Sequence, residues 1–245
     1  MKTIITILFF LISFICNSQI VNYYDMKDGA GTTLTDHKGT AGGTLAGASL
    51  PTWNTGYLSF VGGHNTTGGD YNRVNITNTS YLYLWNESYS WIVIWRSSKA
   101  DAAVHSIVKI RDINSAIAAY IGVHLGTDEL VYNYTQTTST QNKTGVTASA
   151  LCDGFWHISV ITYSTNSTID YIDGALVTIS PNNTISSSIF YTGTSKVVIG
   201  AAYASTAGNY QQDFAGDVCR FINCNSKITG ATVQDIETDF TQLIY

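Results

Sequence analysis

The segment from residue 153 to residue 179 constrains the fold of this chain more than any other feature. Large and small side chains alternate from Phe155 to Tyr163, which is the pattern of a β-strand. A short apolar run at 169–172 follows and ends at Asp173-Gly174. Because Asp-Gly favours a two-residue hairpin turn, a third strand is expected at 175–179. The segment therefore predicts antiparallel strands joined by tight turns.

Similar strand signals recur along the chain with Gly or Asn between them. They cover 20–24, 57–60, 71–75, 90–96, 104–111, 117–124, 130–134, 155–163, 169–172, 175–179, 196–201 and 214–222. The run from Trp91 to Trp95 is apolar on both faces, so it is expected to be a central strand covered on both sides. Many short strands with turn residues between them favour an all-β sandwich or barrel.

The composition agrees with this fold class and limits the partners. The chain has 245 residues, of which 12% are charged, with only 2 Pro and 16 Tyr. This length suits one large all-β domain. The formal net charge is −5 and there is no run of Lys and Arg, so the phosphate backbone of a nucleic acid is excluded as a partner.

The first 19 residues have the pattern of a secretory signal peptide. Lys2 is followed by an apolar run at 4–15 that is too short to span a bilayer comfortably. We therefore expect a signal at 1–19 and one domain at 20–245, secreted or at the cell surface, with no membrane span after cleavage. One alternative is a lipoprotein signal acylated at Cys16, disfavoured because the bulky Ile15 precedes it. A retained N-terminal anchor is another.

The end of the chain has the pattern of a helix. Thr229 can cap a helix at 230–243, in which Val233, Ile236, Phe240 and Leu243 recur at three- and four-residue steps. This spacing predicts one amphipathic helix packed at the edge of the sandwich.

The cysteines predict one disulfide without fixing the pair. With Cys16 removed in the signal, Cys152, Cys219 and Cys224 remain. An odd number in an exported protein implies one bridge plus one unpaired thiol, or pairing with another chain. A bridge from Cys152 to either of the others would close a loop of roughly 70 residues and contribute about 4 kcal/mol.

The order of short motifs resembles a known family. The pattern D-G-x-W-H-x-x-x-x-T-Y at 153–163, followed by Y-x-D-G at 171–174, is similar to the hairpin of laminin-G-like and pentraxin-like domains of the concanavalin A-like lectin/glucanase superfamily. Further pieces occur in the family's order, including W-x-x-G-x-L-x-F at 53–60 and F-x-G-x-V at 214–218. The resemblance implies a two-sheet antiparallel β-sandwich, the jelly roll, with one short C-terminal helix.

The carboxylates argue against catalysis. Glucanases of this superfamily place two carboxylates on one face of a strand, whereas the only Glu residues here are Glu87, Glu129 and Glu237, and none has a partner at that spacing. We therefore expect no enzyme but a binding module that recognises glycans or extracellular and cell-surface proteins through its rim loops. A structural or assembly protein, such as a surface or virion decoration, is the alternative. A divergent polysaccharide-active enzyme is less favoured.

Candidate binding residues lie in predicted loops. Tyr71, Tyr203 and Tyr210 are candidates for stacking on a sugar ring. The resemblance also implies calcium at the sandwich rim, and calcium takes six to eight oxygen ligands. The candidate ligands are Asp70 with Asn72, and Gln212 with Asp213. The alternative is that all four are ordinary solvated loop residues.

Overall fold

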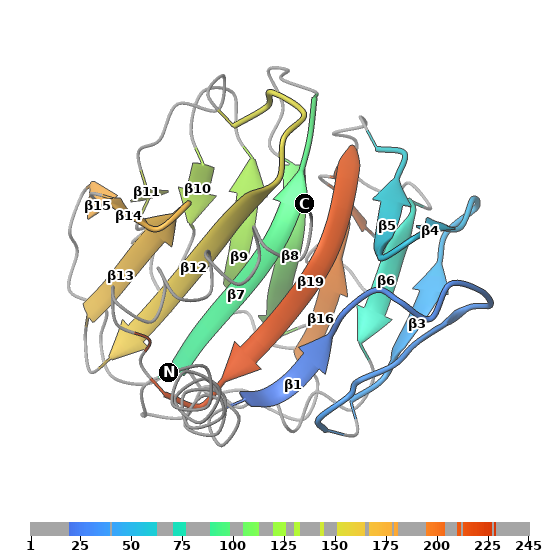
Figure 1. Ribbon diagram of the computed structural model, residues 1–245, viewed down its shortest axis with the longest axis horizontal. Helices are drawn as coiled ribbons and strands as arrows, with labels where there is room; N and C mark the ends of the chain where they lie inside the picture. The colour runs from blue at the N-terminus through green and yellow to red at the C-terminus, as the bar shows by residue number, and fades with distance from the viewer. Residues whose placement is uncertain are drawn as a thin grey trace, which may run out of the picture.

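The computed structural model of this chain contains two antiparallel sheets and no helix among the residues that it describes (Figure 1). The described residues are 20–39, 41–62, 71–76, 89–98, 105–112, 120–125, 130–132, 143–144, 151–164, 167–177, 179–180, 195–203, 210–211, 213–226 and 228. The predicted signal at 1–19 and the predicted helix at 230–243 lie outside them. Within these ranges no helix has the length and apolar character that crossing a bilayer requires.

The first sheet, sheet A, contains the hairpin predicted from the sequence. Its strands in spatial order are β14 (Ala175–Val177), β13 (Ser167–Ile172), β12 (His157–Ser164), β7 (Tyr89–Arg96), β19 (Gly216–Cys224), β5 (Tyr57–Phe60) and β4 (Thr52–Asn54). Strand β1 (Ile20–Tyr24) pairs with the end of β19. Asp173 and Gly174 join β13 to β14 and both have positive φ angles, 49° and 75°, as a type I′ turn requires.

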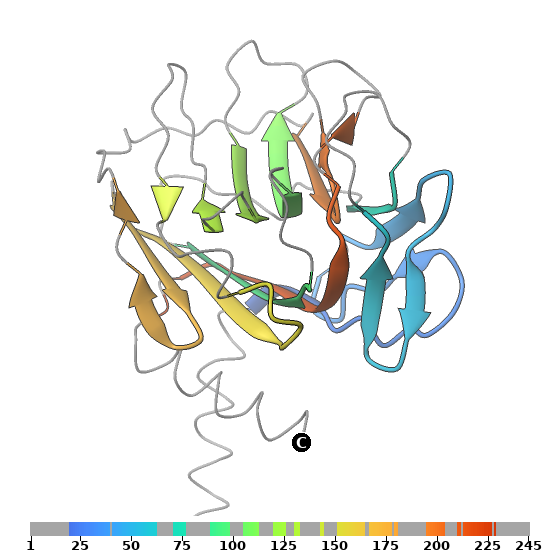
Figure 2. The ribbon, with the colours of Figure 1, turned by 90° about the horizontal axis from the view of Figure 1, so that it is seen from above.

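The second sheet, sheet B, forms the other layer of the sandwich (Figure 2). Its strands in spatial order are β10 (Leu130–Tyr132), β9 (Tyr120–Leu125), β8 (His105–Asp112), β16 (Ser195–Ile199), β6 (Arg73–Ile76), β3 (Gly43–Ala46) and β2 (Thr33–Leu34). Two strand pairs lie apart from both sheets. They are β11 (Lys143–Thr144) with β15 (Ile179–Ser180), and β17 (Ala202–Tyr203) with β18 (Tyr210–Gln211).

Strand β7 is covered on both faces, as the sequence predicts. Trp91, Val93 and Trp95 belong to an interior cluster that joins the two sheets. Ile92 and Ile94 point the other way into an outer cluster with Ile158, Val160 and Cys219. Both tryptophans are fully buried, so β7 is the centre of sheet A in packing as well as in strand order.

Every predicted strand run overlaps a strand of the structure, and the additional strands are short. Strands β2, β3, β4, β11, β17 and β18 have two to four residues each. Several of them lie in Gly-, Thr- and Ala-rich stretches, where the chain carries too few apolar side chains for a readable alternation. Their strand form therefore follows from pairing with neighbours.

Trp156 differs from the expectation that the tryptophans fill the sandwich interior. Along β12, His157 and Ser159 face Trp95 in the interior, so the alternating residues Trp156 and Ile158 face outward. The indole of Trp156 is half-buried against the outer cluster. Strand alternation thus places this ring at the surface.

The disulfide prediction does not match the structure, because no bridge joins Cys152, Cys219 and Cys224. Cys152 packs against the interior cluster, whereas Cys219 and Cys224 lie in the outer cluster. Sheet A therefore separates Cys152 from the other two thiols. Burial raises the pKa of the Cys219 thiol, which keeps it protonated and unreactive.

The buried indole of Trp95 supplies a test of this packing. Its Nε1 donates to Ser159 Oγ at 2.9 Å, and both residues are buried. We expect Ser159→Ala to lower the free energy of unfolding by about 1–3 kcal/mol, since the indole N–H loses its acceptor in a dry interior. Urea unfolding measures this loss.

Ser106→Ala is the matched control. Ser106 is equally buried, but its Oγ has no hydrogen-bond partner within the described part of the chain. This substitution should leave the free energy of unfolding unchanged or slightly higher. Equal losses for the two variants would show that the Trp95–Ser159 hydrogen bond does not matter.

Candidate functional site

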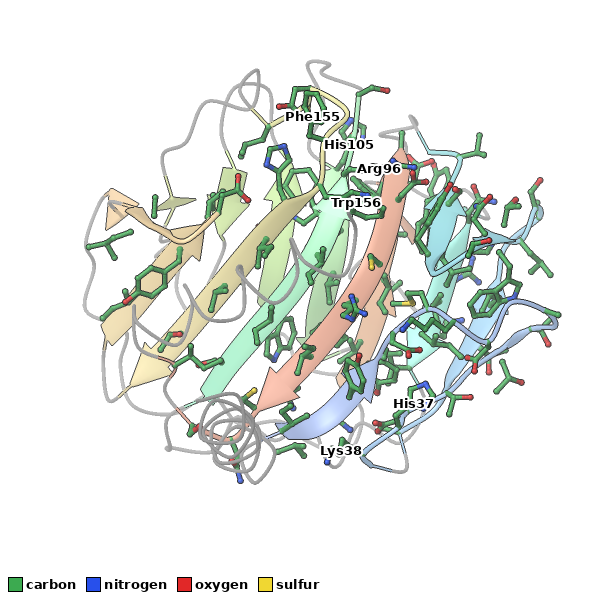
Figure 3. The ribbon with its side chains drawn as sticks, in the orientation of Figure 1. His37, Lys38, Arg96, His105, Phe155 and Trp156 are labelled. Atoms are coloured by element: carbon green, nitrogen blue, oxygen red, sulfur yellow. The ribbon has the colours of Figure 1, made fainter. Side chains whose placement is uncertain are left out.

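The candidate site lies at one end of sheet A, where four neighbouring strands begin or end together. His157 at the start of β12 pairs with Trp95, Asp217 near the start of β19 pairs with Arg96, and Gly216 pairs with Phe60. The loops that leave these strands are therefore gathered at the same rim. Figure 3 shows Phe155, Trp156, Arg96 and His105 at this end and His37 and Lys38 at the opposite end.

Arg96, the last residue of β7, is the centre of the site. Its guanidinium carbon lies 4.7 Å from the centroid of the Trp156 ring and 5.0 Å from that of Tyr57. Both distances are within the range of a cation–π interaction. The Nε atom donates to Asp217 Oδ2 at 2.6 Å. The side chain is thus held by two rings and a carboxylate while staying 32% exposed.

Asp217 is fixed from a second side. Its Oδ1 accepts a hydrogen bond from Ser59 Oγ at 2.6 Å, and Ser59 Oγ accepts one from Asn54 Nδ2 at 2.8 Å. This chain of contacts crosses three adjacent strands, β19, β5 and β4. It sets the position of the carboxylate and, through it, that of the Arg96 guanidinium.

An open cavity of about 330 Å³ lies against this pair. Its lining is Arg96, Ser97, Ser98, Gly154, Gly216 and Asp217. Gly216 is required by the close approach of two strands, because a Cβ there would collide with the backbone oxygen of Arg96. The volume is at the lower end of about 300–1,000 Å³ for small-molecule sites, which suits a small group of a larger ligand.

Phe155 extends the site outward. It directly follows Gly154, which lines the cavity, and its side chain is 69% exposed. An exposed phenylalanine beside a half-buried tryptophan gives the rim two large aromatic side chains next to a charged pocket. Such a combination can stack on a ring and orient polar groups around it.

His157 connects the aromatic turn to the hairpin predicted from the sequence. Its Nδ1 lies 2.8 Å from Asp173 Oδ2, and its Nε2 lies 3.1 Å from Asp153 Oδ1. Asp153 Oδ1 also accepts from the backbone N–H of Phe155, and Asp173 Oδ1 accepts from that of Ile158. The imidazole thus links the turn at 153–156 to the turn at Asp173.

The two carboxylates control the protonation of this imidazole. Burial by itself would lower the pKa of His157, but hydrogen bonding and charge attraction from Asp173, and then from Asp153, raise it above its ordinary value. The sequence contained all three residues, yet W-H and D-G were interpreted there as strand and turn markers only. Their spacing across the hairpin was the available signal.

Two residues predicted for binding have structural roles instead. Tyr71 is only 8% exposed and packs with Val198 and Ala201, so it offers no face for a sugar. Asn72 Oδ1 accepts from the backbone N–H of Val61 at 3.1 Å, and its Nδ2 donates to Ser49 O. The amide of Asn72 therefore joins neighbouring loops and is not available to a calcium ion.

The second predicted metal pair fares similarly as far as it is described. Asp213 is 1% exposed, and its backbone oxygen lies 2.6 Å from His105 Nδ1. Its predicted partner Gln212, like Asp70 of the first pair, lies outside the described residues. Among the residues that the structure describes, no three His, Cys, Asp or Glu side chains come together as a metal site. The residues seen here do not fit calcium, which remains a prediction.

The other two predicted tyrosines are brought together by the backbone. Tyr203 on β17 pairs directly with Tyr210 on β18. Both were expected in loops, and the structure places them instead in two short antiparallel strands. Strand β17 also packs near the end of β16 and against β8.

Comparison with known proteins gives a likeness of structure without one of sequence. No family model and no curated protein matches the chain. A Trypanosoma rangeli sialidase complex superposes with a TM-score of 0.65 at 12% identity, covering 92% of this chain and 33% of the sialidase. The binding domain of botulinum neurotoxin DC, in complex with rat synaptotagmin II, gives 0.65 at 15% identity, covering 91% of this chain and 52% of that one.

A third similar structure is from botulinum neurotoxin type C, described as depending on two ganglioside molecules for cell entry. Its TM-score is 0.61 at 16% identity, with 91% of this chain and 51% of that one covered. The chain thus spans about a third of the sialidases and about half of the toxin domains that it matches. At these identities the likeness shows the fold alone, a β-sandwich shared by sialidases and toxin binding domains.

One conclusion from the sequence is corrected by this comparison. The lack of a glucanase-type carboxylate pair predicted that the chain is not an enzyme, yet the similar structures include several sialidases. The missing motif belongs to one group of enzymes only, so it does not bear on others that contain the same sandwich. With 12% identity and a third of the sialidase covered, catalytic function is not established.

The linkage through His157 predicts a pH dependence of stability. Because the folded pKa is raised, this group stabilises the fold fully below its unfolded pKa of about 6.5, and the contribution is lost as pH rises through the folded pKa. We expect the free energy of unfolding to fall between about pH 6.5 and pH 8. Urea unfolding at a series of pH values measures it.

Two variants assign that slope to this cluster. His157→Gln should abolish it, and Asp173→Asn should reduce it, because Asp173 is the stronger of the two carboxylate partners. A wild-type stability that is constant or rises with pH over this window would contradict the assignment.

Proposed function

We propose that this chain is a secreted binding module of laminin-G-like type, a jelly roll that recognises saccharides at the rim site around Arg96. The observation that carries the proposal is the arginine held between Trp156 and Tyr57 at the mouth of an open cavity. Charged groups in fixed positions beside aromatic faces suit a ligand with hydroxyl groups on one side and apolar C–H groups on the other.

The placement of the site supports the proposal. Both sheets spend their inner faces on the interior cluster, so a ligand is left with the rims and the outer faces. The rim at Arg96 combines an open cavity with the exposed Phe155. A rim position also agrees with the family resemblance, in which loops do the binding.

The similar structures agree with this choice in kind. One toxin domain was solved with synaptotagmin II, and another is described through its interaction with gangliosides. These are a protein and a glycolipid bound by other chains of the same fold. We favour the saccharide for this chain because an arginine with one aromatic ring on each side is a small recessed site, whereas a protein partner needs a broad interface.

Phe155→Ala tests the proposal. We expect this variant to bind saccharides about 3- to 10-fold more weakly than the wild type, because the ring supplies stacking area. Its stability should change little, since Phe155 is 69% exposed. Glycan-array screening identifies the probe, and calorimetry with and without chelator then measures affinity and any need for calcium.

Leu176→Ala is the matched control. Leu176 is 67% exposed on the edge strand β14 and does not line the cavity, so its loss should leave the affinity unchanged. A wild-type protein that binds no saccharide in either condition would reject the proposed function. A protein that only self-associates would support an assembly role instead.

A further inference from the structure

We propose that the Arg96 cavity selects saccharides that carry a carboxylate group over neutral ones. This inference rests on the proposed function, since it names the class of sugar that the same site takes. It follows from an account of which hydrogen-bonding groups in the cavity are already used by the protein and which remain for a ligand.

The guanidinium of Arg96 keeps most of its donors for a ligand. Of its nitrogens, Nε is used by Asp217, and its two faces lie against Trp156 and Tyr57. Within the described part of the chain, neither η nitrogen has an acceptor, although the side chain is 32% exposed and lines the cavity. An arginine whose η nitrogens face an open cavity offers two parallel N–H groups, which match the two oxygens of a carboxylate.

The acceptors around the cavity are used by the protein itself. Asp217 accepts from Arg96 and Ser59 through its two oxygens. The backbone oxygen of Ser97 accepts from Gly154 N–H at 2.9 Å, and Ser97 Oγ donates to Ala215 O at 2.7 Å. The capacity left for a ligand is therefore mainly that of donors, from Arg96 and from the hydroxyl of the exposed Ser98.

The nearby negative charges do not cancel this preference. Asp217 is paired with Arg96, and Asp153 is held by His157 and by the N–H of Phe155. A ligand that approaches the η nitrogens meets the cation first, because the Asp217 oxygens lie on the Nε side of the guanidinium. A neutral sugar could use the same donors singly, but it would forgo the charge-assisted pair.

The experiment compares each acidic polysaccharide with its carboxyl-reduced form, in which the carboxylate becomes a neutral CH₂OH on the same backbone. Suitable probes are polygalacturonate, alginate, hyaluronate and polysialic acid. We expect the wild-type chain to bind at least one acidic form about tenfold more tightly than its reduced form, with an affinity that falls as salt is raised.

Three variants that each change the net charge by −1 separate the site from bulk charge. Arg96→Gln removes the fork, and Ser98→Asp places a carboxylate on the cavity wall without touching the Arg96–Asp217 pair. Both should lose the preference for the acidic form. Lys38→Gln, an exposed cation at the opposite end of the sandwich, should keep it (Figure 3). Ser98→Asp keeps the test valid if Arg96→Gln does not fold.

The outcomes distinguish this inference from the function on which it rests. Equal binding of acidic and reduced forms, or an acidic preference that survives in both Arg96→Gln and Ser98→Asp, would overturn the carboxylate preference while leaving saccharide binding intact. Failure to bind any saccharide, acidic or neutral, would overturn both.

Discussion

Burial of β7 on both faces is the constraint on which the rest of this structure depends. Trp91, Val93 and Trp95 face sheet B, and Ile92 and Ile94 face the outer cluster. A strand with two apolar faces must have neighbours on each side and a layer above and below. Strands β12 and β19 therefore flank it, and their register with β7 fixes which residues reach the rim.

That register brings chemistry from distant parts of the chain to one place. Arg96 ends β7, Asp217 follows the start of β19, and Trp156 precedes β12. Each residue is unremarkable in the sequence, since an isolated arginine at a strand end has no pattern of its own. The site exists because three strands end level with one another, with Gly216 allowing the two backbones to approach closely.

The sequence predicted the strands well and the binding residues poorly, for one physical reason. Alternation of apolar side chains reports which residues of a strand are buried, so the long strands and the Asp173-Gly174 turn could be read directly. Tyr71 and Asn72 were chosen because they lie beside glycines in an apparent loop. The structure buries Tyr71 and uses both amide groups of Asn72 between loops, a result of tertiary packing.

The sequence alone determined that this chain is an antiparallel β protein with a doubly buried central strand, because strand propensity and side-chain periodicity act locally. Tertiary structure decided that Trp156 faces outward onto Arg96, that Cys152 is kept apart from Cys219 and Cys224, and that His157 lies between two carboxylates. These outcomes depend on strand register and on which face of sheet A each residue occupies. Only the pairing of strands far apart in the sequence fixes both.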